Sequence, residues 1–239
     1  MEFPKVDYKF WLSYWNKSIG KAGVYTNKNI EKYIQFDKDI NHCTSEIIEL
    51  TNKDDISKKN ILRVVDLIYS WGGPSGRMFY SKTKGKISPR EELETNEITY
   101  KTYLEGIEFA KQGKSVCIEI FNRIKGIGSS YASKHSYFWS INSSNPLIIV
   151  DSKIAGSLGY RTIDDLEKDF KYNEIVKGFL KKSKIEFNEK DPSKVERSLF
   201  AFHNFYFLND NSNWKNKDQF KDYKEAEKIA KILFENNNN

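Results

Sequence analysis

The stretch Ile124-Lys125-Gly126-Ile127-Gly128-Ser129-Ser130-Tyr131-Ala132 decides which fold this chain is expected to adopt. Two glycines two positions apart allow a tight turn between a helical segment that ends near Ile124 and a second one that follows. Farther along, the apolar run Leu-Ile-Ile-Val at 147–150 leads into Asp151, and a helical segment closed by glycine follows at 152–159. The sequence therefore predicts a helical hairpin, followed by an aspartate at the start of a further helix.

A helix-hairpin-helix unit of this type can hold a phosphate of a nucleic-acid backbone without reading the base sequence. Gly126 and Gly128 let the main chain come close to the anion, and Lys125 adds a cation in the turn. From Ser129 onward, the second helix presents unpaired N–H groups and the positive end of its dipole. The first helix, the turn and the second helix are expected over residues 117–124, 125–128 and 129–139.

Asp151 has two interpretations. A carboxylate directly before a helix is a common N-cap residue. A capping carboxylate that accepts backbone N–H bonds also stays ionised, and a fixed anion is what the chemistry of a cationic sugar needs. Asp151 is therefore the candidate catalytic residue.

Composition indicates a packed globular protein. Of the 239 residues, 38% are hydrophobic and 15% aromatic, and the net charge of +6 suits a polyanionic partner, although the charges are spread along the chain. Cys43 and Cys117 have no partner at metal or redox spacing and fit reduced thiols in the cytoplasm. His42, His135 and His203 share no metal-ligand spacing, so no metal site made of side chains is expected. The amino terminus has no signal-peptide core and no apolar run approaches about 20 residues, so neither secretion nor a membrane span is expected.

Helical periodicity dominates the rest of the chain and strand-like alternation is scarce, so the expected fold class is all-α. Ser57 is a suitable N-cap for a helix with an apolar face, and Pro192 stands where a first-turn proline belongs. The face of the last helix is apolar apart from Glu227. Helices are expected over residues 7–16, 27–35, 43–51, 57–68, 91–110, 192–206 and 220–233.

The segment 72–89 is rich in glycine and lysine and is expected to be a long loop. Long loops in compact domains are often functional. This one is either a surface connector or, with Trp71 and Arg77, part of the wall of a cleft.

Over residues 124–159, the chain resembles the helix-hairpin-helix (HhH-GPD) DNA glycosylase superfamily. The pattern [LI]-x-G-[IV]-G-x-x-x-A and the later Val-Asp pair both match, and Leu158-Gly159 closes the matching segment. The segment 192–206 is similar to the helix that closes the base pocket in the 8-oxoguanine glycosylase branch. The resemblance implies two helical subdomains that flank a cleft, with the hairpin and Asp151 at its mouth.

The resemblance also implies a division of the chain. Residues 1–235 would form a single glycosylase-like unit, with a disordered tail at 236–239. Within it, residues of about 91–190 would carry the hairpin, and about 1–90 plus 191–235 would form the second subdomain.

Ser130 stands where bifunctional members of the family carry the lysine that attacks the sugar and later cuts the strand. Monofunctional members carry other residues there and use an activated water. The resemblance therefore implies a monofunctional enzyme, a hydrolase of N-glycosyl bonds without abasic-site lyase activity. Ser130 and Asp151 are 21 residues apart (151 − 130), slightly more than the family's usual gap, so a small insertion is expected at 141–146.

Lys134 lies one helical turn after Ser130, on the same face. Three roles remain open for it: a contact to a DNA phosphate, a contact to the flipped base, or a replacement for the missing nucleophilic lysine.

The identity of the excised base stays open. Candidate pocket residues are aromatic or able to bind a base edge, although each aromatic is also a common core residue; they are Trp71, Arg77, Phe202, Phe205 and Tyr206. An oxidised purine would mean base excision repair, whereas a hypermodified phage base would mean anti-phage defence.

The expected partner is double-stranded DNA, bound by a monomer in the cytoplasm. No cofactor is expected, apart from a structural monovalent cation that carbonyl groups of the hairpin can hold. The alternative to an enzyme is a non-catalytic helix-hairpin-helix DNA-binding protein, in which Asp151 only caps a helix.

Overall fold

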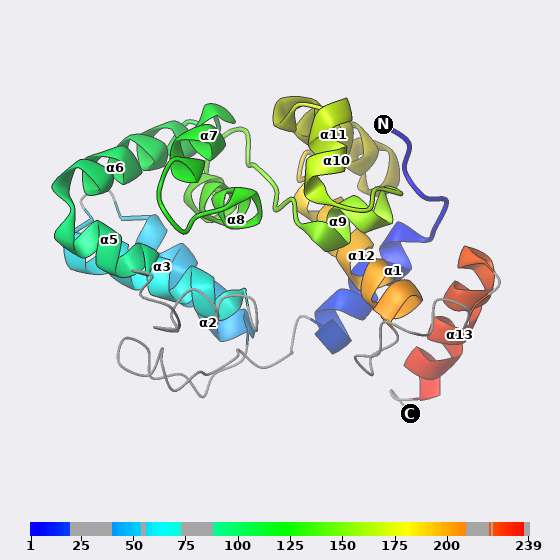
Figure 1. Ribbon diagram of the computed structural model, residues 1–239. Helices are drawn as coiled ribbons and strands as arrows, with labels where there is room; N and C mark the ends of the chain where they lie inside the picture. Colours follow the sequence, from blue (N-terminus) through cyan, green and yellow to red (C-terminus); the bar gives the residue numbers. More distant parts are fainter. Residues whose placement is uncertain (20–39, 54–55, 73–87, 209–219, 221, 237–239) are drawn as a thin grey trace. The chain divides into compact units, whose positions relative to one another are not determined.

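The computed structural model describes residues 1–19, 40–53, 56–72, 88–208, 220 and 222–236. Over these residues the chain is helical and forms no strand, which confirms the all-α fold class (Figure 1). The chain divides into two compact units. We call Gly20–Ile149 the hairpin unit, and we call Met1–Ile19 with Val150–Asn239 the aspartate unit.

These bounds differ from those expected for the two subdomains. The first helices of the hairpin unit, α2 (Ile40–Thr51) and α3 (Lys58–Trp71), pack on the second helix of the hairpin, α8 (Ser129–Ser140). Residues from 150 onward pack instead with the amino-terminal helix and the last helices.

The hairpin unit is built around α8, whose residues 131–140 are all buried. Helices α2, α3, α6 and α7 all contact it. Ser57 caps α3 as expected, because its Oγ accepts a hydrogen bond from the N–H of Asn60 at 3.3 Å. The other helices among the described residues of this unit are α5 (Pro89–Thr95), α6 (Glu97–Lys111) and α7 (Val116–Asn122).

The single helix expected over 91–110 is wrong, because two helices, α5 and α6, meet at Asn96. Asn96 leaves the helical conformation (φ −111°, ψ 105°), and its side chain accepts hydrogen bonds from the N–H groups of Ile98 and Thr99. It thus ends α5 and caps α6. At the other end of α5, Ser88 and Glu91 form a capping box.

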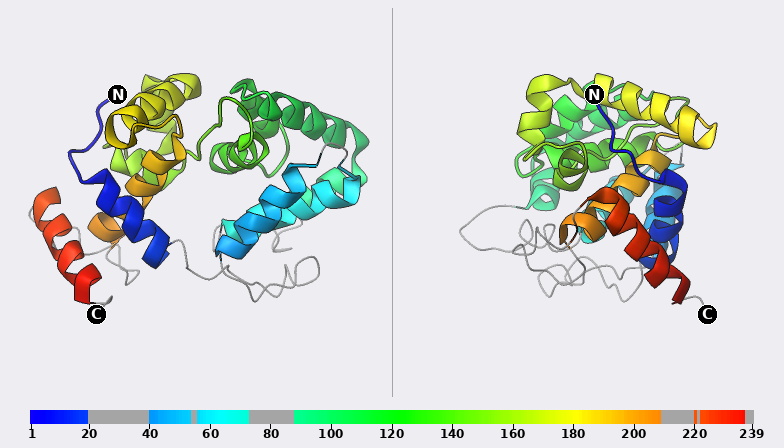
Figure 2. Two further views of the ribbon diagram at one scale, coloured as in Figure 1. Left: turned by 180° about the vertical axis from the view of Figure 1, so that it is seen from behind. Right: turned by 90° about the vertical axis from the view of Figure 1, so that its right-hand side faces the viewer.

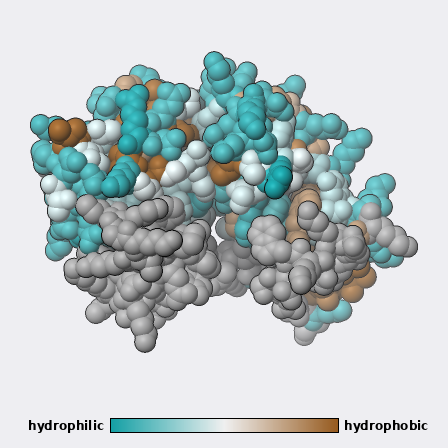
Figure 3. Space-filling view, viewed as in Figure 1, coloured by the Kyte–Doolittle hydropathy of each residue, from teal (hydrophilic) through white to brown (hydrophobic). Residues whose placement is uncertain are grey.

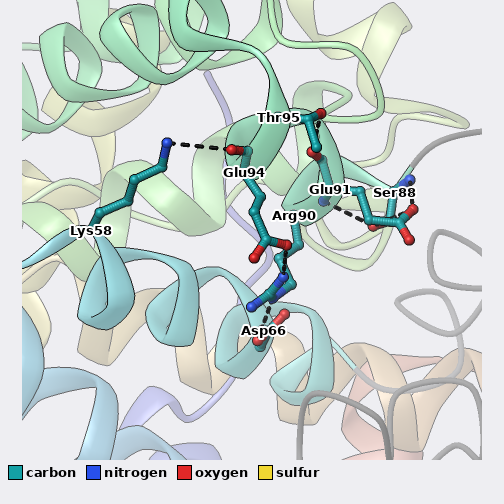
Figure 4. Close-up of polar contacts among 7 residues, drawn as sticks. All are labelled: Lys58, Asp66, Ser88, Arg90, Glu91, Glu94 and Thr95. Atoms are coloured by element: carbon teal, nitrogen blue, oxygen red, sulfur yellow. Dashed lines mark hydrogen bonds and ion pairs between the residues drawn. The ribbon is translucent and has the colours of Figure 1, made fainter.

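A nearly buried ion pair joins α5 to α3. Arg90 Nε lies 3.2 Å from Asp66 Oδ2, and its guanidinium also pairs with Glu94 one turn along α5 (Figure 4). The side chain of Asp66 is 4% exposed. The attraction of Asp66 and Glu94 outweighs burial and raises the pKa of Arg90. Removal of Arg90 would leave a buried carboxylate without this partner, which is the costly way to break such a pair.

The aspartate unit combines both ends of the chain. Its helices are α1 (Tyr8–Tyr14), α9 (Ser152–Ser157), α10 (Ile163–Asp169), α11 (Tyr172–Phe187), α12 (Ser193–His203) and α13 (Tyr223–Asn236). Two π-helical turns follow α1 and α12, at Trp15–Ile19 and Asn204–Leu208. Its aromatic core is formed by the cluster of Trp11, Trp15, Ala201, Phe202 and Ala230.

Glu227, the one acidic residue on the apolar face of the last helix, is explained by the amino-terminal segment. Its Oε2 accepts hydrogen bonds from the N–H of Asp7 at 2.7 Å and from the indole N–H of Trp11 at 3.1 Å. The carboxylate thereby satisfies two donors and fixes α13 beside α1 (Figure 2).

Some expected elements cannot be compared. The helix expected at 27–35, Arg77 in the long loop and the tail at 237–239 lie outside the described residues. Helices α10 and α11 were not among the expected elements.

Candidate functional site

The hairpin has the expected order of helix, turn and helix, from α7 to α8. Gly126 in the turn has φ +89°, a left-handed conformation that side chains other than glycine rarely adopt. A Cβ at this position would also lie 2.8 Å from Cγ of Pro89. Ile127 N–H donates to the carbonyl of Ile124 at 2.9 Å and closes the turn. Gly126 is therefore required by the fold itself.

Gly128, in contrast, is not required by packing. It is exposed and extended at the N-cap position of α8, and a Cβ there would meet nothing within 4 Å. No side chain caps α8, so its first turn keeps backbone N–H groups directed outward from the helix end. With the exposed Lys125 beside it, this helix end can receive an anion.

Two tyrosines support the turn from inside the hairpin unit. Tyr69 donates its hydroxyl hydrogen to the carbonyl of Gly126 at 3.2 Å and stacks on Tyr131 at 4.4 Å between ring centroids. Gly72 leaves room for the Tyr131 hydroxyl, since a Cβ there would lie 2.3 Å from it. The expected carbonyl site for a monovalent cation thus includes a carbonyl that already accepts one hydrogen bond.

The structure brings Ser130 and Lys134 together, as their spacing predicted. Lys134 Nζ donates to Ser130 Oγ at 2.9 Å and lies 5.1 Å from the centroid of the Tyr131 ring. Lys134 is only 5% exposed, whereas Ser129 and Ser130 are half-buried. An ammonium group therefore lies next to position 130 and comes from the next turn of α8.

His135, directly after Lys134, belongs to a buried polar network. Trp139 Nε1 donates to the Tyr103 hydroxyl at 3.1 Å, so that hydroxyl donates its own hydrogen to His135 Nδ1 at 2.8 Å. The proton of the neutral imidazole is then on Nε2, which has no hydrogen-bond partner among the described residues. Burial, helped by the charge of Lys134, lowers the pKa of His135 to about 3. The role of His135 is structural.

In the aspartate unit, Asp151 is the N-cap of α9. Its Oδ1 accepts hydrogen bonds from the N–H groups of Lys153 at 3.0 Å and Ile154 at 3.1 Å. These two bonds hold the carboxylate in one orientation at the start of α9. Asp151 remains half-buried and is not enclosed by the protein around it.

Polar side chains from α12 lie against α9, close to Asp151. Lys153 Nζ donates to Asn204 Oδ1 and lies 4.4 Å from the centroid of the Phe200 ring. His203 fills the space left by Gly156, where a Cβ would lie 2.5 Å from Nε2. Burial, followed by the charge of Lys153, lowers the pKa of His203 to about 4 against the opposing effect of Asp151. A carboxylate, an ammonium group and a neutral imidazole therefore lie together in one unit.

Sequence reasoning missed Lys153, His203 and Asn204. Position 153 is visible as a lysine two residues after the aspartate. The approach of His203, which is 47 residues beyond Gly156 (203 − 156), depends on the packing of α9 on α12. The π-helical turn that starts at Asn204 has no evident signal in the sequence.

The expected pocket residues lie in both units. Trp71 belongs to the hairpin unit, donates its indole N–H to Thr44 Oγ1 at 3.0 Å and packs edge-on against Phe138. Arg77 lies outside the described residues, and the other three, Phe202, Phe205 and Tyr206, belong to the aspartate unit. Phe202 is fully buried in the aromatic core, Phe205 packs on Trp11 and Tyr206 stacks on Phe202.

Comparison of the chain with protein-family models, curated proteins and solved structures found no match. Within the described parts of the chain, no three or more His, Cys, Asp or Glu side chains gather as a metal site would need. In the same parts, no helix is both long and apolar enough to cross a bilayer.

Proposed function

We propose that the protein is a monofunctional DNA N-glycosylase in which Asp151 is the catalytic carboxylate. The observation that carries this proposal is how the Asp151 carboxylate is held and how far it is buried. Two backbone N–H groups hold its carboxylate in one orientation, and it is half-buried and stands beside Lys153 and His203 rather than in an apolar core.

The chemistry needs such an anion. As the bond from C1′ of the deoxyribose to the base nitrogen breaks, its electron pair leaves with the base and the sugar becomes an oxocarbenium-like cation. Asp151 stabilises that cation and orients a water whose oxygen bonds to C1′. One proton of the water is released and the departing base takes up a proton, which leaves a free base and an abasic site. The base must first be flipped out of the duplex.

Double-stranded DNA is the proposed partner, bound by a monomer in the cytoplasm. The uncapped start of α8, the exposed Lys125 and the open surroundings of Gly128 support a phosphate contact that does not depend on base sequence. Ser129 would add its backbone N–H and hydroxyl to that contact. A monovalent cation bound to hairpin carbonyls would assist as a structural ion.

Ser130 supports the absence of lyase activity. A hydroxyl at that position cannot form an imine with the sugar aldehyde, so the product strand would stay uncut. The excised base would be an oxidised purine or a hypermodified phage base. Release of base from modified phage DNA, measured beside release from a duplex with oxidised guanine, decides between defence and repair.

The test of the proposal is Asp151→Asn. Asparagine is as good an N-cap as aspartate, so α9 is expected to stay folded while the charge is lost. We expect base release to fall by at least about 100-fold, in line with the loss of one electrostatic group, and DNA affinity to change little. The matched control is Asp7→Asn, the same change at the N-cap of α1 in the same unit, which should leave base release unchanged. Full activity of Asp151→Asn would disprove the catalytic role.

A non-catalytic DNA-binding protein is the second candidate, because Asp151 makes the bonds of an ordinary N-cap. It predicts that the wild-type protein binds duplex DNA and releases no base from any modified substrate.

A further inference from the structure

Helix α11 of the aspartate unit, Tyr172–Phe187, has one face turned toward its own unit and one toward solvent. The inner face buries Ile175, Val176 and Phe179, and α11 packs on α12 and α1. On one flank, Gly178 is covered by the amino-terminal residue Met1, whose Cε would lie 2.3 Å from an added Cβ. Only the remaining face is available to a partner.

That outer face carries a row of three exposed lysines, Lys177, Lys181 and Lys184. We call it the α11 lysine row. At 3.6 residues per turn the three lie within an arc of about 60°, and they span about 10 Å along the helix axis. Asn173 and Glu174 each lie about 20° outside this arc, on opposite sides, and the arc itself contains no carboxylate.

The positive charge of the α11 lysine row is not neutralised by ion pairs with nearby carboxylates. Among the described residues, none of the three lysines forms an ion pair. The carboxylates nearest in sequence are used elsewhere. Glu186 pairs with Lys182 and Glu189 pairs with Lys194, both at under 3 Å. Glu174 turns back to cap the start of the helix, where Oε2 accepts the N–H of Lys171 at 2.8 Å.

The acidic helix α10, which precedes α11, does not offset the row either. It packs against α9, and the row starts more than one turn into α11. Two of its carboxylates are occupied, Asp165 by Lys168 and Asp169 by the Tyr160 hydroxyl. In the space-filling view, the surface over α10 and α11 is largely hydrophilic (Figure 3). On α11 itself the exposed side chains are mostly polar or charged, and Ile185, 68% exposed beside Lys184, is the one large apolar side chain exposed there.

We infer that the α11 lysine row is a second contact to the phosphate backbone of duplex DNA, separate from the hairpin. That the partner is DNA rather than another polyanion rests on the proposed function. The exposure and arrangement of the three lysines do not depend on it. A duplex carries one negative charge per about 1.7 Å of axis, so about 10 Å of lysines faces about six charges. Flexible ammonium groups without base-edge partners suit a contact that positions the duplex and does not specify sequence.

The experiment compares two triple variants of the full chain. One is Lys177→Gln/Lys181→Gln/Lys184→Gln. The control is Lys101→Gln/Lys224→Gln/Lys228→Gln, which removes the same charge from exposed lysines that also form no ion pair among the described residues. The affinity for an unmodified duplex is measured at several salt concentrations between about 50 and about 200 mM. Circular dichroism checks that both variants stay folded.

We expect the α11 variant to lower the slope of log affinity against log salt by about 2 to 3, since each phosphate contact contributes about 0.9. The control should change it by less than about 1. Equal slopes for the two variants would overturn the inference while leaving base release, and hence the proposed function, intact. A wild-type protein that does not bind duplex would refute both. Loss of binding to vesicles of anionic lipid, with unchanged DNA binding, would assign the row to a membrane surface instead.

Discussion

At the residue scale, Lys134 places its ammonium group beside Ser130. Its ammonium group reaches back to Ser130 Oγ and lies over the Tyr131 ring, both on the same turn of α8. Both contacts are made by the charged ammonium, whereas attack on a sugar aldehyde needs the neutral amine.

We therefore expect that borohydride traps no covalent adduct between the protein and a duplex with an abasic site. The readout is a shifted band on a denaturing gel, with Lys101→Ala as the control for an exposed lysine outside the hairpin. An adduct that Lys134→Ala abolishes and Lys101→Ala retains would identify Lys134 as a nucleophile and contradict the assignment of a monofunctional enzyme.

At the scale of elements, the two glycines in the turn between α7 and α8 are expected to differ in role, one in folding and the other in DNA binding. Gly126→Ala should lower the free energy of unfolding by about 1–3 kcal/mol, because alanine disfavours φ +89° and its Cβ would meet Pro89. Gly128→Ala should cost less, since φ is −82° and the surrounding space is open. Chemical denaturation measures both values.

For DNA affinity we expect the reverse order, with the larger effect in Gly128→Ala. Gly128→Ala places a methyl group where the phosphate would approach, so its affinity for duplex should fall although it stays folded. Equal affinity for Gly128→Ala and wild type would show that the start of α8 does not contact DNA.

Local signals made much of the helical pattern predictable. The caps at Ser57 and Asp151 are short-range, since a side chain bonds the backbone two or three residues on, and both were found in the sequence. The break at Asn96 was missed because helical patterning and acidic residues continue on both sides of it. The contact of His203 with Gly156 depends on tertiary packing, so no sequence window contains it.

At the scale of the whole molecule, each unit holds a histidine that is neutral when folded. Their pKa values are lowered to about 3 for His135 and about 4 for His203, mainly by burial, whereas an unfolded histidine titrates near 6.5. The unfolded chain therefore binds more protons below about pH 6.5. Stability is fully present above that pH and is lost as the pH falls toward 4 and 3.

We expect unfolding to become easier by a few kcal/mol between pH 7 and pH 4, with similar contributions from His135 and His203, whose different pKa values separate their effects only below about pH 4. His135→Gln should be less stable at pH 7, because it disturbs the bond to Tyr103, yet its stability should depend less on pH. Denaturant titrations at pH 4, 5, 6 and 7 give both quantities. An unchanged pH dependence in His135→Gln would show that folding does not lower the pKa of this imidazole.

The discontinuity of the aspartate unit has a consequence for biosynthesis. As the ribosome extends the chain, residues 20–149 emerge as one continuous stretch and can complete their unit early. Helix α1 leaves the ribosome before residues 20–149 but finds Glu227 and the α12 core only after residues 193–227 have also emerged. Until then Trp11 lacks its contacts to Phe202 and Phe205, so this aromatic segment of the nascent chain is one that a chaperone would have reason to hold.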